Sequence, residues 1–111
     1  MSNKNFIIKI NPSKSKKDNK VEIILENELT IYSIESMQDQ ILNTLEKHKS
    51  ISINIQNVSN IDLSFIQFLY SLKITANEQS KQVELFANLT KEIQVLFSSS
   101  GISNFFNIKT I

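Results

Sequence analysis

This 111-residue sequence contains few of the residues that usually form catalytic, metal or phosphate-binding sites. Cysteine is absent, which excludes disulfides, thiolate-bound zinc, iron–sulfur clusters and thiol catalysis. The only glycine is Gly101, so neither a P-loop nor a dinucleotide-binding glycine motif is present. All twelve basic residues are lysine, and without arginine no bidentate guanidinium contact to phosphate is available. A small nucleotide-binding module, the alternative of another functional class, is therefore disfavoured.

Asp62, Ser64 and the single histidine, His48, could be drawn as a hydrolytic triad, but nothing in their spacing assembles them. Asp62 and Ser64 both stand where a helix is expected to begin, and either can cap it, Ser64 through a capping box with Gln67. His48 stands at the expected end of another helix, where a cation suits the helix dipole. The carboxylates are scattered, so neither metal ligation nor glycosidase chemistry is indicated. We expect no enzyme, no cofactor and no metal.

Composition is that of one soluble globular domain over residues 1–111, with 41% hydrophobic and 21% charged residues and a net charge of +1. No apolar run resembles a signal peptide or a spanning helix, so we expect a cytoplasmic protein. Residues 11–20 hold the only proline and four lysines, and are expected to form an exposed loop between two strands. A contact patch for anions is the functional alternative there. Residues 102–111 are expected to form a tail that docks on the domain.

Hydrophobic periodicity predicts the elements that must position these residues. Alternating apolar and polar residues predict strands at Phe6–Ile10, Val21–Leu25, Ser50–Asn57 and Gln82–Ala87. Apolar stripes at helical spacing predict helices from Ser33 or Ser36 to His48, from Asp62 or Ser64 to Asn77, and from Leu89 to Ser99. A turn is expected at residues 26–28 and a loop at 58–61. Gly101 is expected to close the last helix in the left-handed conformation.

This order predicts an antiparallel hairpin followed by parallel strands joined through right-handed helical crossovers. Strands buried on both faces would be continuously apolar, whereas these alternate, so helices should cover only one face of the sheet. The prediction is a two-layer α/β fold with a mixed, mostly parallel sheet of four or five strands.

A resemblance follows from residues 57–74, NVSNIDLSFIQFLYSLKI, and 83–106, VELFANLTKEIQVLFSSSGISNFF. These stretches resemble STAS domains, the domains of anti-sigma-factor antagonists and sulfate-transporter tails, and the similarity covers roughly residues 20–106. Asp62 matches the family's aspartate. The hydroxyl that directly follows it in the family, the phosphoacceptor, is replaced by Leu63, and the family's glycine is replaced by Phe65. Leucine cannot accept a phosphoryl group, and Ser64 is the remaining hydroxyl that could.

The resemblance implies a STAS-like, non-enzymatic regulatory or adaptor domain of the anti-sigma-antagonist kind, which switches partners by protein docking. The implied partner is an anti-sigma factor, a serine-kinase-like protein or another signalling protein, with no nucleic acid, no membrane insertion, and a monomer or weak dimer. An accessory subunit of a lipid-transport or other membrane ATPase is the alternative. The residues expected to contact the partner are Asn57, Ser59, Asn60, Asp62, Leu63, Ser64 and Phe65.

Overall fold

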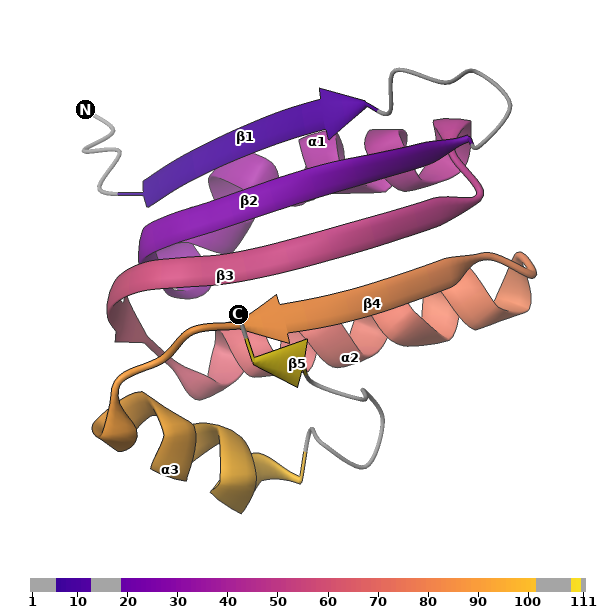
Figure 1. The fold of residues 1–111 in the computed structure, drawn as a ribbon. Helices are drawn as coiled ribbons and strands as arrows, with labels where there is room; N and C mark the ends of the chain where they lie inside the picture. The colour runs from indigo at the N-terminus through magenta and orange to yellow at the C-terminus, as the bar shows by residue number, and fades with distance from the viewer. Residues whose placement is uncertain (1–5, 13–18, 102–108, 111) are drawn as a thin grey trace.

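The computed structural model describes residues 6–12, 19–101 and 109–110. Over these residues the chain forms five strands and three helices (Figure 1). In chain order they are β1 (Phe6–Pro12), β2 (Lys20–Leu29), α1 (Ile31–Lys47), β3 (Ser50–Ile61), α2 (Leu63–Glu78), β4 (Gln82–Ala87), α3 (Lys91–Ser100) and β5 (Lys109–Thr110). None of the three helices is long and apolar enough to span a lipid bilayer.

The strands form one sheet in the order β1-β2-β3-β4-β5. β1 pairs with β2 in the antiparallel sense, and the pairs β2–β3, β3–β4 and β4–β5 are parallel. The predicted hairpin and parallel crossovers are therefore confirmed. β5 is a two-residue strand that pairs with the last two residues of β4.

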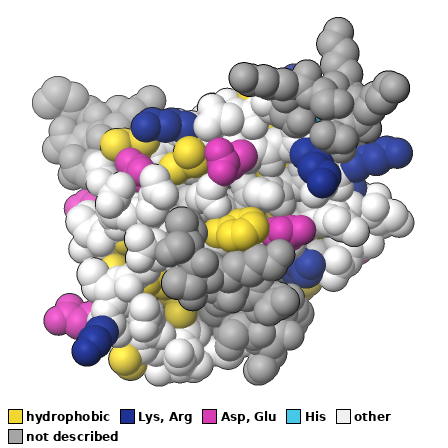
Figure 2. Space-filling view, viewed as in Figure 1, with side chains coloured by type: hydrophobic (Ala, Val, Ile, Leu, Met, Phe, Trp, Pro, Cys, Tyr) yellow, Lys and Arg dark blue, Asp and Glu magenta, His cyan; other side chains and the backbone are white. Residues whose placement is uncertain are grey.

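α1 and α2 lie behind the sheet in Figure 1, and α3 lies below β4 and β5. The alternation of each strand turns one set of side chains toward these helices. The buried hydrophobic residues of β2, β3 and β4 are Val21, Ile23, Leu25, Leu29, Ile51, Ile53, Ile55, Ile61, Val83, Leu85 and Ala87. The other face, which Figure 2 shows, carries mostly polar and charged side chains of both signs with isolated hydrophobic ones. The predicted two-layer α/β fold is confirmed.

The turn expected at residues 26–28 and the loop expected at 58–61 are both wrong. β2 continues to Leu29 and β3 continues to Ile61, and the two strand ends pair with each other. The pairing is irregular between Leu25 and Glu28, and two asparagines with positive φ lie within the irregular stretch, Asn27 at 73° and Asn57 at 51°. Asparagine tolerates this left-handed backbone better than other non-glycine residues, which lets both strands bend and go on.

Two helix starts also differ from the prediction. α1 begins at Ile31 after the N-cap Thr30, because the hydroxyl of Ser33 accepts the backbone N–H of Thr30 at 3.3 Å and fixes that first turn. Ser36, the expected cap, is exposed within the helix. α3 begins at Lys91, because the Thr90 hydroxyl accepts from the N–H of Ile93.

The ends of the remaining predicted segments fit in part. Gly101 closes α3 with φ of 78°, as expected. Asn11 and Pro12 belong to β1 and Lys20 to β2, so both ends of the predicted loop are strand. Residues 13–18, 102–108 and 111 lie outside the described residues, and the exposed loop and the docked tail stay predictions there.

Ile53→Ala is expected to destabilise the protein by about 2–5 kcal/mol, because it opens a cavity in a fully buried site between sheet and helices. Ile24→Ala, on the open face of β2 where the side chain is half-buried, should cost less than about 1.5 kcal/mol. Urea unfolding of both variants measures the difference. Equal losses would contradict a sheet that is covered on one face only.

Candidate functional site

Asp62 lies between the end of β3 and the start of α2, and its carboxylate binds two helix starts. One oxygen, Oδ1, accepts the backbone N–H of Phe65 in the first turn of α2 at 2.9 Å. The other oxygen, Oδ2, accepts the N–H of Ile31, the first residue of α1, at 3.0 Å. The N–H of Asp62 itself donates to the carbonyl of Leu29 on β2 at 3.2 Å. A single residue therefore caps α2 and holds the start of α1 beside it.

This arrangement gathers three exposed hydrophobic side chains at the carboxyl edge of the sheet. Leu29 and Ile61 pair across β2 and β3, and each is followed within two residues by the first residue of a helix. Ile31, Tyr32 and Leu63 occupy these helix starts, with exposed fractions of 47%, 79% and 51%. We call the surface formed by Ile31, Tyr32 and Leu63, together with the exposed Asn57, Ser59 and Asn60, the docking edge.

Sequence reasoning missed Ile31 and Tyr32 in this surface. The available signal was that Tyr32 does not fit the apolar stripe of α1, whose buried members are Met37, Ile41 and Leu45. An aromatic residue outside a core stripe points to the surface. The hydrogen bond from Ile31 to Asp62, 31 positions away, could not be read from local pattern.

Four of the residues predicted to contact a partner are exposed on the docking edge, namely Asn57, Ser59, Asn60 and Leu63. Asp62 and Ser64 are half-buried, and Asp62 rather than Ser64 is the cap of α2. The prediction for Phe65 is wrong, because its side chain is fully buried. As the third residue of α2 it turns into the core, where its ring lies 6.1 Å from that of Phe68.

Glu26 joins β2 to β3 just before the docking edge. Its carboxylate oxygen Oε2 accepts from Nε2 of Gln56 at 2.7 Å and from Nδ2 of Asn57 at 3.2 Å. These two amide donors, with a smaller contribution from the charge of Lys9, hold the pKa of Glu26 below its ordinary value of 4.5. The side chain is only 8% exposed, so the ionised carboxylate acts as a cross-strand tie at the irregular part of the sheet.

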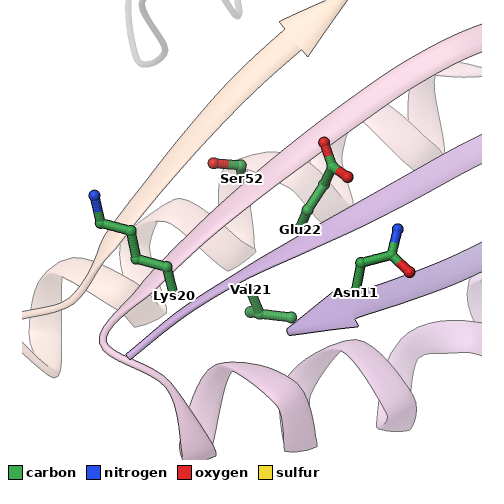
Figure 3. A pocket seen from close by; sticks show the side chains of 5 residues that line it. All are labelled: Asn11, Lys20, Val21, Glu22 and Ser52. Atoms are coloured by element: carbon green, nitrogen blue, oxygen red, sulfur yellow. The ribbon is translucent and has the colours of Figure 1, made fainter. Parts of the chain in front are cut away.

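Two shallow hollows flank the parallel strands. The first, at the carboxyl end, is lined by Asn57 and Val58 of β3 and by Asn88, Leu89 and Thr90, which follow β4. None of these lining residues is ionisable. The second lies toward the other end of the strands and is lined by Asn11, Lys20, Val21, Glu22 and Ser52 (Figure 3). Its Glu22 accepts a hydrogen bond from Asn54 of the neighbouring strand.

His48 lies far from Asp62 and Ser64, so the three residues do not form a hydrolytic triad. Nδ1 of His48 lies 2.9 Å from the carbonyl oxygen of Thr44 at the end of α1, whereas Asp62 binds the N–H at the beginning of that helix. The 17 residues between these ends span about 25 Å. Within the described part of the chain, no group of three His, Asp or Glu residues could hold a metal ion.

A comparison with known families decides the classification. A family model described as "Mlab, STAS domain" matches residues 13–108. The chain belongs to the STAS family. No curated protein matches it.

Solved structures similar to this STAS domain share its fold at low sequence identity. The phosphorylated form of SpoIIAA, a Bacillus cell fate determinant, has a TM-score of 0.68 at 16% identity, covering 95% of this chain and 91% of that one. The unphosphorylated form, an anti-sigma factor antagonist, has a TM-score of 0.73 at 16% identity, covering 95% and 88%. An uncharacterised DUF3478 protein from Shewanella loihica with a SpoIIAA-like fold has a TM-score of 0.59 at 17% identity, covering 100% and 90%.

Asp62→Ala is expected to lower the free energy of unfolding by about 2 kcal/mol, because two helix starts lose their acceptor. Asp62→Asn keeps one side-chain oxygen and should lose roughly half as much. Urea unfolding is the measurement, with Asp39→Ala on the exposed face of α1 as the control, expected within about 0.5 kcal/mol of wild type. A loss for Asp62→Ala no larger than the control would contradict the double cap.

Glu26→Gln is expected to destabilise the protein at neutral pH, and less so in acid. Because the pKa of Glu26 is lowered in the folded state, its contribution is present above the unfolded value of 4.5 and is lost as pH falls through the lower folded value. Unfolding curves of wild type and variant should therefore converge below pH 4.5. Glu46→Gln, exposed at the end of α1, is the control; a difference for Glu26→Gln that is unchanged in acid would contradict the assignment.

Proposed function

We propose that this STAS domain is a non-enzymatic regulatory module that binds a partner protein through its docking edge, and that phosphorylation at position 63 does not gate the binding. The observation that carries the proposal is Leu63, which is 51% exposed at the first position of α2 and directly follows the capping Asp62. In the family pattern a hydroxyl stands there, and it receives the regulatory phosphoryl group.

Charge explains why this substitution matters. A phosphoryl group would bring a charge of about −2 to the start of α2, where the helix dipole tolerates it and a partner's acidic surface is repelled. Leucine presents an apolar side chain at the same place, and burying it against a partner is favourable at about 25 cal/mol per Å². Position 63 therefore favours docking that phosphorylation there cannot switch off.

The composition of the docking edge suits a protein partner. Ile31, Tyr32 and Leu63 provide exposed apolar and aromatic area, and Asn57, Ser59 and Asn60 provide uncharged hydrogen-bonding groups around it. Aromatic and apolar anchors within a polar rim are typical of protein interfaces.

Two acidic residues of the described part of the chain, Glu28 and Glu35, lie near the docking edge. Glu28 is the last residue but one of β2, and Glu35 lies one helical turn beyond Ile31 and Tyr32 on α1. The sequence contains no lysine between Lys20 and Lys47, nor between Lys49 and Lys73. A basic rim on the partner, which we expect to be an anti-sigma factor or a kinase-like signalling protein, would complement this surface.

Leu63→Glu is expected to weaken binding of the dominant partner at least about 10-fold, because it removes an anchor and places a charge where an apolar group is buried in the complex. Gln67→Glu, one turn later on the exposed side of the same helix, adds the same charge beyond the docking edge and should leave binding within about 2-fold. Quantitative affinity capture from the native cells measures both.

Equal capture by wild type and Leu63→Glu would contradict the proposal, as would equal loss in both variants. The identity of the dominant partner separates the two candidate settings. An anti-sigma factor or a kinase-like protein supports the signalling role, and the ATPase of a membrane transport system supports the accessory-subunit role.

A further inference from the structure

Lysines gather at the opposite edge of the sheet, where the parallel strands begin. Lys20 is the first residue of β2, Lys49 directly precedes β3, and Lys81 directly precedes β4. Lys47 is the last residue of α1, which returns to the same edge. We call the surface formed by Lys20, Lys47, Lys49 and Lys81 the basic edge. The right-hand side of the molecule in Figure 2, where β2, β3 and β4 begin in Figure 1, shows dark blue side chains close together.

Backbone hydrogen bonds hold these lysines in one row. The N–H of Lys49 donates to the carbonyl of Asn19, next to Lys20, at 3.1 Å, and the N–H of Gln82 donates to the carbonyl of Lys49 at 3.0 Å. Neighbouring strands lie about 4.8 Å apart, so the charges fall within a Debye length of about 10 Å and act together.

The lysines of this row have different tasks. The ammonium group of Lys81 donates to the carbonyls of Leu45 and Glu46 at 2.5 and 2.8 Å, and so caps the end of α1. Lys20, Lys47 and Lys49 are exposed, and their charges face solvent. They form the part of the basic edge that is open to a ligand.

Among the described residues, two exposed carboxylates lie near this row, against its three exposed lysines. Glu46 and Glu78 are the exposed carboxylates near it, on the last turns of α1 and α2. Glu22 lies on the open face of β2 and is hydrogen-bonded to Asn54. The chain has a net charge of only +1, yet four lysines gather at the basic edge, while Glu28, Glu35 and Asp62 lie near the docking edge.

We propose that the basic edge binds the surface of an anionic lipid bilayer and turns the docking edge away from it. An extended plane of negative charge suits exposed ammonium groups spread along a row of strand starts, each contributing about a 5-fold increase in binding. Nucleic acid fits less well, because residues 19–22, 46–52 and 78–84 include no arginine for bidentate contacts and no Phe, Tyr or Trp to stack on bases. Glu28 and Glu35, which lie near the docking edge, would be repelled from the same plane, which favours an orientation with the docking edge away from the bilayer.

Vesicle co-sedimentation of the full chain at about 20 mM salt tests the proposal, because surface charges are weakly screened there. The probes are phosphatidylcholine vesicles with and without about 30 mol% phosphatidylglycerol. Wild type should bind only the anionic vesicles, and Lys20→Gln combined with Lys49→Gln should weaken that binding roughly 25-fold. The matched control removes two exposed lysines elsewhere, Lys9→Gln on β1 with Lys91→Gln at the start of α3, and should change binding less than about 3-fold. Thermal unfolding verifies that both double variants are folded.

Three results would overturn the proposal. These are no binding to anionic vesicles, equal loss in the two double variants, and tighter binding to single-stranded RNA or polyglutamate than to vesicles at the same salt. The last result would assign the basic edge to a nucleic acid or to an acidic protein. Leu63→Glu binds vesicles as wild type does if the two edges act independently, so a failure of the docking proposal is distinguishable from a failure of this one.

Discussion

The first backbone N–H groups of a helix have no partner within the helix, and two helices of this protein meet that need at one carboxylate. Asp62 accepts the N–H of Phe65 in α2 and the N–H of Ile31 in α1. A carboxylate with two oxygens can do this, and its negative charge also suits the positive end of both helix dipoles. The two helix starts are thereby held side by side, which makes Ile31, Tyr32 and Leu63 parts of one surface.

The sheet brings these helix starts to the same edge. β2 and β3 run parallel and remain paired to their last residues, Leu29 and Ile61, so both helices begin at one level. Just before these strand ends, where the pairing is irregular, Glu26 links β2 to β3. Its carboxylate accepts hydrogen bonds from the side-chain amides of Gln56 and Asn57. α1 and α2 cover one face of the sheet.

Sequence periodicity was sufficient for the first four strands, the three helices and the two-layer α/β fold, because alternation and helical spacing report burial directly. It did not predict the two-residue strand β5 in the segment expected to be a tail. It misplaced the ends of β2 and β3, because a strand that bends through left-handed residues such as Asn27 and Asn57 looks like a turn in sequence. Phe65 was misassigned because a position in the first helical turn can face either core or solvent, and only packing decides. Ile31 and Tyr32 were missed because a hydrogen bond to Asp62 joins segments 31 residues apart.

The docking edge and the basic edge lie at opposite ends of the parallel strands. The proposed function depends on the docking edge. Site-specific photo-cross-linking in the native cells examines that edge most directly, with the cross-linking amino acid placed in turn at positions 32, 63 and 77. If the docking edge binds the partner, positions 32 and 63 capture the same protein, and position 77, exposed at the far end of α2, does not. Capture of the dominant partner from position 77 with none from 32 and 63 would contradict it.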